Sequence, residues 1–126
     1  MNETQNSKTG STGRLDGRLL EYGVRIIAAS QSLPRTDVGR HVSLQMLRSG
    51  TSAGANCQEA RGAESRSDFI HKMQIVLKEL RETCYWLCIA EKAHLTPARC
   101  LKEIVQESDE LIAMTVKSIV TARSRQ

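Results

Sequence analysis

Residues Met46–Ala90 have the sequence MLRSGTSAGANCQEARGAESRSDFIHKMQIVLKELRETCYWLCIA. In its second half, apolar or small side chains recur at alternating steps of four and three, the spacing of one buried helix face. In its first half, Ser49–Ala55 is an unbroken run of small residues. The stretch therefore predicts two long helices joined by a short polar turn. The expected core positions of the later helix are Phe69, Met73, Val76, Leu80, Thr83, Leu87 and Ala90.

The same spacing recurs on either side of this stretch. The earlier helix is expected to bury Leu15, Leu19, Tyr22, Ile26, Ala29 and Leu33. The last helix is expected to bury Leu101, Ile104, Val105, Ser108, Leu111, Ile112, Thr115 and Ile119. With short connections between them, four such helices predict an all-α, antiparallel up-down-up-down four-helix bundle.

Turn and cap residues mark where the helices begin and end. Pro34 ends the first, because the residue before a proline is disfavoured in helical geometry, and Gly62 is expected at the end of the second. The expected N-caps are Thr36 or Asp37 for the second helix, Ser65 for the third, and Thr96 for the fourth, with Pro97 at its first helical position.

Length and composition agree with one helical domain. The chain has 126 residues and 3% aromatic residues, so its core must be aliphatic, which suits helices. Residues 1–13 are Ser, Thr, Asn and Gly without apolar periodicity and are expected to form a disordered arm, leaving 14–123 for the bundle. The sequence contains neither a membrane-spanning run nor a signal-peptide segment, so we expect a cytoplasmic protein.

The cysteines do not predict a metal site or a disulfide. Cys84 and Cys88 lie one turn apart in an apolar helix, where free cysteine usually serves as a small buried residue. A metal site completed by Cys57 or a histidine would lack a known ligand spacing. We therefore predict no metal, no cofactor and no small-molecule substrate.

The small residues of the second helix predict a close helix contact. Gly50 and Gly54 each cost about 1 kcal/mol relative to alanine inside a helix, so we expect a neighbouring helix, or a neighbouring subunit, to pack tightly against them. Leu44 and Leu47 lie beside them, and both sides of this helix have buriable residues. We therefore list these four as candidate oligomer-interface residues.

A second candidate interface lies on the later helix. Stepping by about 100° per residue places Ile75, Trp86 and Ile89 away from the core stripe. Three aligned apolar residues, including the only tryptophan of the chain, indicate a subunit interface more than an irregular bundle covered by the N-terminal arm.

Polar residues of the second and third helices are expected to set the helix register. Asn56 and Glu59 belong to the second helix, and Glu79 and Glu82 to the third, with Arg48, Arg61 or Lys78 as possible partners. Buried polar groups require hydrogen bonds, so we interpret these residues as a structural polar network and not as a catalytic group.

Residues 47–82, LRSGTSAGANCQEARGAESRSDFIHKMQIVLKELRE, resemble the core motif of four-helix-bundle proteins encoded in intervening sequences of bacterial 23S rRNA genes. In that family, small residues ending in Asn-x-x-Glu precede a polar turn and a Phe-Ile pair. The corresponding positions here are Ser52–Asn56, Glu59, Ser65–Ser67 and Phe69-Ile70, and the likeness extends from about Leu15 to Arg123. Ala60 and Arg61 precede Gly62 where the family often has glycine directly after the glutamate, which concerns only the end of the second helix.

The resemblance implies a bundle that assembles into a ring, most simply a homopentamer. It supplies no catalytic residues. Some relatives, such as accessory proteins of diversity-generating retroelements, bind nucleic acid through basic surfaces. The net charge of +4 is mild, yet an assembly would multiply it. Candidate RNA or DNA phosphate contacts are Arg48, Arg61, Arg66 and Lys72.

Two alternatives to a nucleic-acid-binding assembly remain. One is a scaffold that binds another protein through the Trp86 face. The other is a helical ribonuclease with an arginine and a histidine close in sequence, for which Arg66 with His71 and Arg35 with His41 have suitable spacing. Among the arginines and histidines of this chain such a match arises by chance, so we predict a protein that is not an enzyme.

Overall fold

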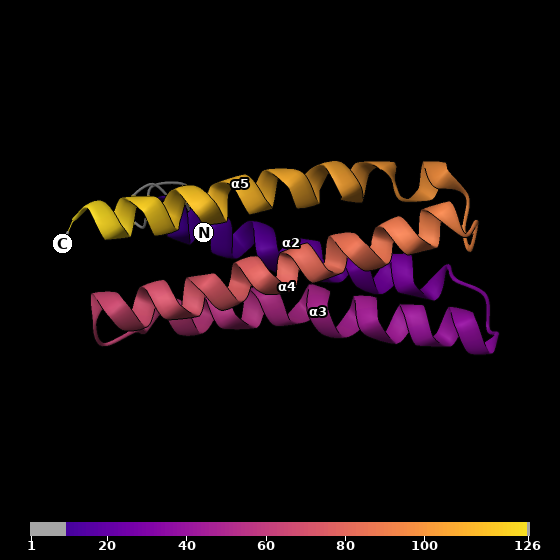
Figure 1. Cartoon of the computed structure of the whole chain (residues 1–126), viewed down its shortest axis with the longest axis horizontal. Helices are drawn as coiled ribbons and strands as arrows, with labels where there is room; N and C mark the ends of the chain where they lie inside the picture. The colour runs from indigo at the N-terminus through magenta and orange to yellow at the C-terminus, as the bar shows by residue number, and fades with distance from the viewer. Residues whose placement is uncertain (1–9, 126) are drawn as a thin grey trace.

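The computed structural model describes residues 10–125, which form long helices and no strand. These are α2 (Gly10–Gln31), α3 (Asp37–Arg61), α4 (Arg66–Lys92) and α5 (Lys102–Ser124), with a single 3₁₀ turn, η1 (Ala98–Cys100), before α5. Figure 1 shows the four helices side by side, with the α3–α4 connection at one end and the other two connections at the opposite end. α3 packs against α2 and α4, and α5 packs against α4 and α2. The arrangement is consistent with a four-helix bundle around one core.

The expected core stripes are largely buried. Leu15, Leu19, Tyr22 and Ile26 of α2 are inaccessible to solvent or nearly so, as are Met73, Val76, Leu80 and Leu87 of α4. α5 contributes Ile104, Leu111 and Ile119. Phe69 is only half-buried, and the neighbouring Ile70 occupies the core in its place. Ala29, Val105 and Ile112 are likewise half-buried and pack against the core, so the periodicity identified most of the core and not all of it.

Two of the expected N-caps are confirmed. The Thr36 hydroxyl accepts a hydrogen bond from the Gly39 N–H at 3.0 Å, and the Ser65 hydroxyl accepts one from the Asp68 N–H at 3.0 Å. Each satisfies a backbone donor that the first turn of a helix leaves unpaired. Gly62 is the C-cap of α3, as expected.

The predicted start of the last helix is wrong. Thr96 does not cap α5, because η1 lies between them and α5 begins at Lys102 without a side-chain cap. The Thr96 side chain is buried and accepts a hydrogen bond from the Ser32 hydroxyl at 3.3 Å. It therefore joins two connections at the same end of the molecule, a contact between distant residues that no local cap signal reveals.

The expected boundary of the N-terminal arm also shifts. α2 begins at Gly10, so residues 10–13 are helical and not part of an arm, while residues 1–9 lie outside the described part of the chain. Because the first N–H groups of a helix need no intrahelical partner, Gly, Ser and Thr are tolerated there. Within residues 10–125, no helix has a stretch long and apolar enough to cross a membrane.

Candidate functional site: an uncharged groove between α2 and α3

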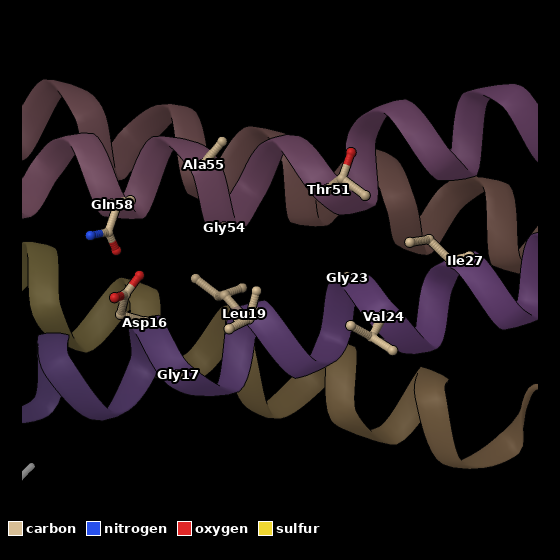
Figure 2. Close-up of a pocket in the computed structure, with 11 residues that line it drawn as sticks. Asp16, Gly17, Leu19, Gly23, Val24, Ile27, Thr51, Gly54, Ala55 and Gln58 are labelled. Atoms are coloured by element: carbon tan, nitrogen blue, oxygen red, sulfur yellow. The ribbon is translucent and has the colours of Figure 1, made fainter. Parts of the chain in front are cut away.

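The most distinctive surface feature is a groove of about 490 Å³ between α2 and α3. Figure 2 shows Val24 and Ile27 on one helix, with Thr51 and Ala55 across from them on the other. Asp16 lies at one end, and the other described lining residues are uncharged. The lining residues are Asp16, Gly17, Leu19, Leu20, Gly23, Val24, Ile27, Thr51, Gly54, Ala55 and Gln58.

One side of the groove is a ridge of large apolar side chains on α2. Leu20 is 71% exposed, Val24 61% and Ile27 41%. They follow one another at steps of four and three, so they form a second apolar stripe beside the buried one. This second stripe was not predicted, although its spacing is visible in the sequence. We had assigned α2 a single apolar face.

The other side of the groove is shallow because α3 presents small residues there. Thr51, Gly54 and Ala55 leave room beside the α2 ridge, and Gly23 keeps α2 itself narrow at the same level. Leu44, further along α3, is 63% exposed. Apolar side chains of this size, grouped on one face and left in water, are characteristic of an interaction surface.

Polar contacts close one end of the groove. The Arg61 guanidinium forms an ion pair with Asp16 at 3.1 Å. With its amide nitrogen turned toward Asp16, Gln58 donates to both carboxylate oxygens at 2.9 and 2.6 Å, and Figure 2 shows these two side chains facing each other. Asp16 is thus neutralised within the chain, which leaves no uncompensated charge at this end of the groove.

The expected close approach at Gly50 and Gly54 occurs between helices of the same chain. A β-carbon added to Gly50 would lie 2.8 Å from two carbons of the Ile26 side chain, and one added to Gly54 would lie 3.4 Å from the Leu19 carbonyl oxygen. Gly50 is buried. Of the two expected neighbours, a helix or a subunit, the structure places α2 against Gly50, so this residue is not on an exposed surface.

The other candidate interface residues are less exposed than expected. Ile75, Trp86, Ile89 and Leu47 are all half-buried. Trp86 lies edge-on to the rings of His41 and Tyr85, with centroids 5.5 and 5.2 Å apart. Ile75, Trp86 and Ile89 are therefore partly covered and not fully exposed, in the case of Trp86 by His41 of α3, and their role as an interface stays a prediction.

The expected polar network divides into separate groups. On α3 and α4, Arg48 pairs with Glu79 at 3.4 Å and with Glu82, which also accepts a hydrogen bond from the Trp86 indole N–H at 3.1 Å. The Arg48 guanidinium and then the Trp86 hydrogen bond hold the pKa of Glu82 below its usual range. Glu79 is almost fully buried, so Arg48 compensates a charge that would be costly alone.

Asn56 and Glu59 do not belong to this group. The Asn56 amide donates to the Ser52 carbonyl at 2.9 Å and to the Ser52 hydroxyl at 3.1 Å, one turn back along α3. Glu59 pairs with Lys72 at 2.8 Å, and this hydrogen bond raises the pKa of Lys72. The three carboxylates thus tie α3 to α4 at two separate places, whereas Asn56 bonds only within α3.

Most of the candidate phosphate contacts already have carboxylate partners. Arg48 binds Glu79 and Glu82, Arg61 binds Asp16, and Lys72 binds Glu59. Arg66 is exposed, and no carboxylate of the described residues forms an ion pair with it. A cation that is neutralised within the chain contributes less to phosphate binding, so the four do not form one basic site.

The cysteine prediction is partly wrong. Cys57 is buried, and burial raises the pKa of its thiol to about 12, which makes it an inert core residue. Cys84 is half-buried, whereas Cys88 and Cys100 are exposed. A step of four along α4 places Cys88 outside the helix contacts that cover Cys84. Among the residues described, no three His, Cys, Asp or Glu side chains gather as a potential metal site.

These features define an all-helical protein with an apolar groove on its surface and ion pairs between its helices. The sequence matches the family of 23S rRNA-intervening sequence proteins over residues 18–117, and the chain belongs to this family.

Comparison with solved structures agrees with that assignment. The fold is similar to the crystal structure of a protein of unknown function from the S23 ribosomal protein family of Bacteroides thetaiotaomicron. The TM-score is 0.81 and the sequence identity 36%, over 86% of this chain and 97% of that chain. No curated protein sequence matches the chain significantly.

Proposed function

We propose that this protein is a non-enzymatic assembly subunit. In this proposal, copies of an antiparallel, up-down-up-down bundle associate through the α2/α3 groove, most simply as a homopentameric ring. The observation that carries it is the exposed ridge of Leu20, Val24 and Ile27 beside small residues of α3.

Free energy favours covering this ridge. Burying apolar surface gains roughly 25 cal/mol per Å², and a groove without uncompensated charge adds no large desolvation cost. The small residues opposite the ridge permit a partner to approach closely. The copy number of five comes from the family resemblance. A head-to-tail contact between identical subunits forms a ring when successive copies close on one another.

Light scattering coupled to size-exclusion chromatography tests this proposal. We expect an oligomeric mass for the unmodified chain at micromolar concentration and a monomeric mass for Val24→Glu. Val120→Glu on α5 is the matched control, because Val120 is 58% exposed and lies outside the groove. A monomeric unmodified chain would overturn the assembly. An oligomeric Val24→Glu would remove the groove from the interface.

Binding of RNA or DNA is a second proposed function, supported by arginines at one end of the molecule. Arg14, Arg66, Arg123 and Arg125 are exposed and lie at helix ends that Figure 1 draws together, near the α3–α4 connection and the C-terminus. Glu64 and Asp68 belong to the same end and reduce its charge. Repeated around a ring, this end would present a basic rim to phosphates.

Electrophoretic mobility shifts with structured RNA and with duplex DNA test this second function. We expect affinity that falls steeply with salt and depends little on sequence. Replacing Arg66 and Arg123 by Gln is expected to weaken binding and flatten the salt dependence, whereas Arg40→Gln is the control, because Arg40 pairs with Asp37 at the start of α3, at the opposite end of the molecule. Absence of binding below tens of micromolar at low salt would exclude this role.

The protein-scaffold alternative would use the Trp86 face, which is half-buried, and is therefore less well supported than the groove. The ribonuclease alternative rests on sequence spacing alone. His41 contacts Trp86, and among the described residues neither His41 nor His71 forms a hydrogen bond with an arginine. RNA cleavage that disappears when both histidines are replaced by Ala would contradict the proposal of a non-enzymatic protein.

A further inference from the structure

Each of the four helices contributes one fully buried hydroxyl group to a contact with another helix. The four residues are Tyr22, Ser49, Thr83 and Ser108, and each is fully buried. Each lies between two buried apolar residues of its own helix, about one turn away on either side. These flanking pairs are Leu19 and Ile26, Met46 and Ala53, Leu80 and Leu87, and Ile104 and Leu111.

The four hydroxyls form a hydrogen-bonded layer across the helices. The Tyr22 hydroxyl lies 2.7 Å from the Ser108 hydroxyl, which joins α2 to α5. The Thr83 hydroxyl donates to the Ser49 hydroxyl at 2.8 Å, which joins α4 to α3.

Counting hydrogens identifies the donor in the Tyr22–Ser108 pair. A hydroxyl has one hydrogen, and the Ser108 hydroxyl donates to the Ile104 carbonyl at 2.8 Å, so Tyr22 must be the donor to Ser108. In the second pair, the Ser49 hydroxyl donates to the Gln45 carbonyl at 2.8 Å, while Thr83 shares its one hydrogen between the Glu79 carbonyl of its own helix and the Ser49 hydroxyl, both at 2.8 Å. Among the described residues, no buried side-chain polar atom lacks a partner. The serine and threonine hydroxyls keep an acceptor on their own helix, whereas the Tyr22 hydroxyl depends on this alignment of α2 and α5 for its hydrogen bond to Ser108.

The apolar layers above and below do not have this selectivity. Leu, Ile, Val and Met side chains at heptad spacing replace one another with little change in volume, so a helix displaced by one repeat still buries apolar surface. The same displacement would separate Tyr22 from Ser108 and Thr83 from Ser49, and a Tyr22 hydroxyl left against hydrocarbon would cost the desolvation of an unpaired polar group.

We propose that this four-helix hydroxyl layer selects the axial register of the bundle, a positioning role that is separate from its contribution to stability. The inference does not depend on assembly through the groove. Polar groups buried in otherwise apolar helix contacts fix register in coiled coils.

The test removes the hydroxyls with little change of shape, in a variant carrying Tyr22→Phe, Ser49→Ala, Thr83→Val and Ser108→Ala. Two double variants, Tyr22→Phe/Ser108→Ala and Ser49→Ala/Thr83→Val, each remove one pair. Thr115→Val is the matched control, because Thr115 is fully buried but donates only to the Leu111 carbonyl of its own helix.

Methyl NMR spectra and amide hydrogen exchange provide the readout, at one protein concentration for all variants. We expect the quadruple variant to keep its melting temperature within about 5 °C, about the shift for 1 kcal/mol in a domain near this size. Its methyl groups are expected to show more than one set of signals, and its core amides to exchange faster. Each double variant should show a weaker form of this effect, and Thr115→Val should show a single set.

Either of two results would overturn the proposal. A quadruple variant with one sharp set of methyl signals and unchanged amide protection would show that the apolar layers alone select the register. Loss of folding in the quadruple variant and in both double variants would show that the hydroxyls supply stability and not selection.

Discussion

At the scale of single residues, His94 has the most unusual backbone of the described chain. Its φ is 55°, in the left-handed region, directly after the C-cap of α4 at Ala93. The Leu95 N–H returns to the Ala90 carbonyl at 2.9 Å, which is the closure typical of a helix that ends in a left-handed residue. Glycine is the usual residue at such a position, because a β-carbon is disfavoured there.

We predict that His94→Gly stabilises the protein by about 1 kcal/mol, because glycine removes the strain of the left-handed conformation. Chemical denaturation at equal protein concentration measures the change. Ala93→Gly is the control, since Ala93 has ordinary φ and should lose stability from added freedom of the unfolded chain. A loss of stability in His94→Gly would show that the imidazole contributes more than the strain costs.

Residue-scale features were predictable from the sequence wherever the signal is local. The Thr36 and Ser65 caps are local, because the side chain and the N–H that it accepts from belong to the same turn. The role of Thr96 was not predictable from the sequence, because its partner Ser32 is distant along the chain. A threonine before a proline is equally compatible with an N-cap and with a buried contact between distant connections. Only the folded chain distinguishes these two roles.

At the scale of helices, the contact between α2 and α3 depends on glycine at one position more than at others. A β-carbon at Gly50 would meet the Ile26 side chain at 2.8 Å, whereas one at Gly23 would meet its nearest neighbour, a Thr51 methyl, at 3.9 Å. The first distance is a clash and the second an ordinary contact. The two glycines therefore differ in what they contribute.

We predict opposite effects for the two substitutions. Gly50→Ala should destabilise the protein by about 1–3 kcal/mol, because the overpacked helices must separate. Gly23→Ala should stabilise it by about 0.5–1 kcal/mol, because alanine is the better helix former and finds space. Unfolding of both variants in denaturant measures this difference. The comparison is direct when the unfolding free energy of each variant falls with denaturant concentration at the same slope. Equal effects would contradict it.

The ion pairs between α3 and α4 predict a pH dependence. Arg48 lowers the pKa of Glu82 from a usual value near 4.5. A carboxyl whose folded pKa is depressed contributes stability above its unfolded pKa, and this contribution disappears as the pH falls through the folded pKa. Arg48→Gln should therefore be less stable than the unmodified chain at pH 7, with the difference shrinking below about pH 4.5.

Thermal unfolding of both proteins between pH 7 and pH 3 measures this effect. Arg40→Gln is the control, because Arg40 pairs with the fully exposed Asp37 on its own helix, and such pairs contribute little. A difference between Arg48→Gln and the unmodified chain that stays constant down to pH 3 would assign the loss to packing and not to the carboxylates.

At the scale of the whole molecule, the exposed α2 ridge links stability to assembly. Association of folded copies stabilises the folded state by mass action. We predict that the melting temperature of the unmodified chain rises by a few degrees when its concentration increases about a hundredfold. Calorimetry at the two concentrations checks this, and Val24→Glu should melt at the same temperature in both. A melting temperature independent of concentration in the unmodified chain would contradict assembly.

A substitution at Trp86 does not provide a clean test of the assembly. Trp86→Asp would place a further carboxylate beside Glu82, which accepts the indole hydrogen bond, and near the buried Glu79. We therefore expect this variant to lose stability within each copy, by repulsion between like charges. Its melting temperature at low protein concentration measures that loss. A variant as stable as the unmodified chain would restore the Trp86 face as a candidate interface.

The sequence by itself determined the helices, most of their ends and their buried stripes, because hydrophobic periodicity and cap residues act within a few turns of one chain. It also contained the family motif between Leu47 and Glu82. Only the tertiary structure decided which remaining surfaces are covered. Ile26 fills the space at Gly50 while Leu20 and Val24 stay in water, although all three are aliphatic residues of α2. Their exposure depends on which side of α2 faces α3 and how closely the two helices approach, and both are set by packing between residues distant in sequence.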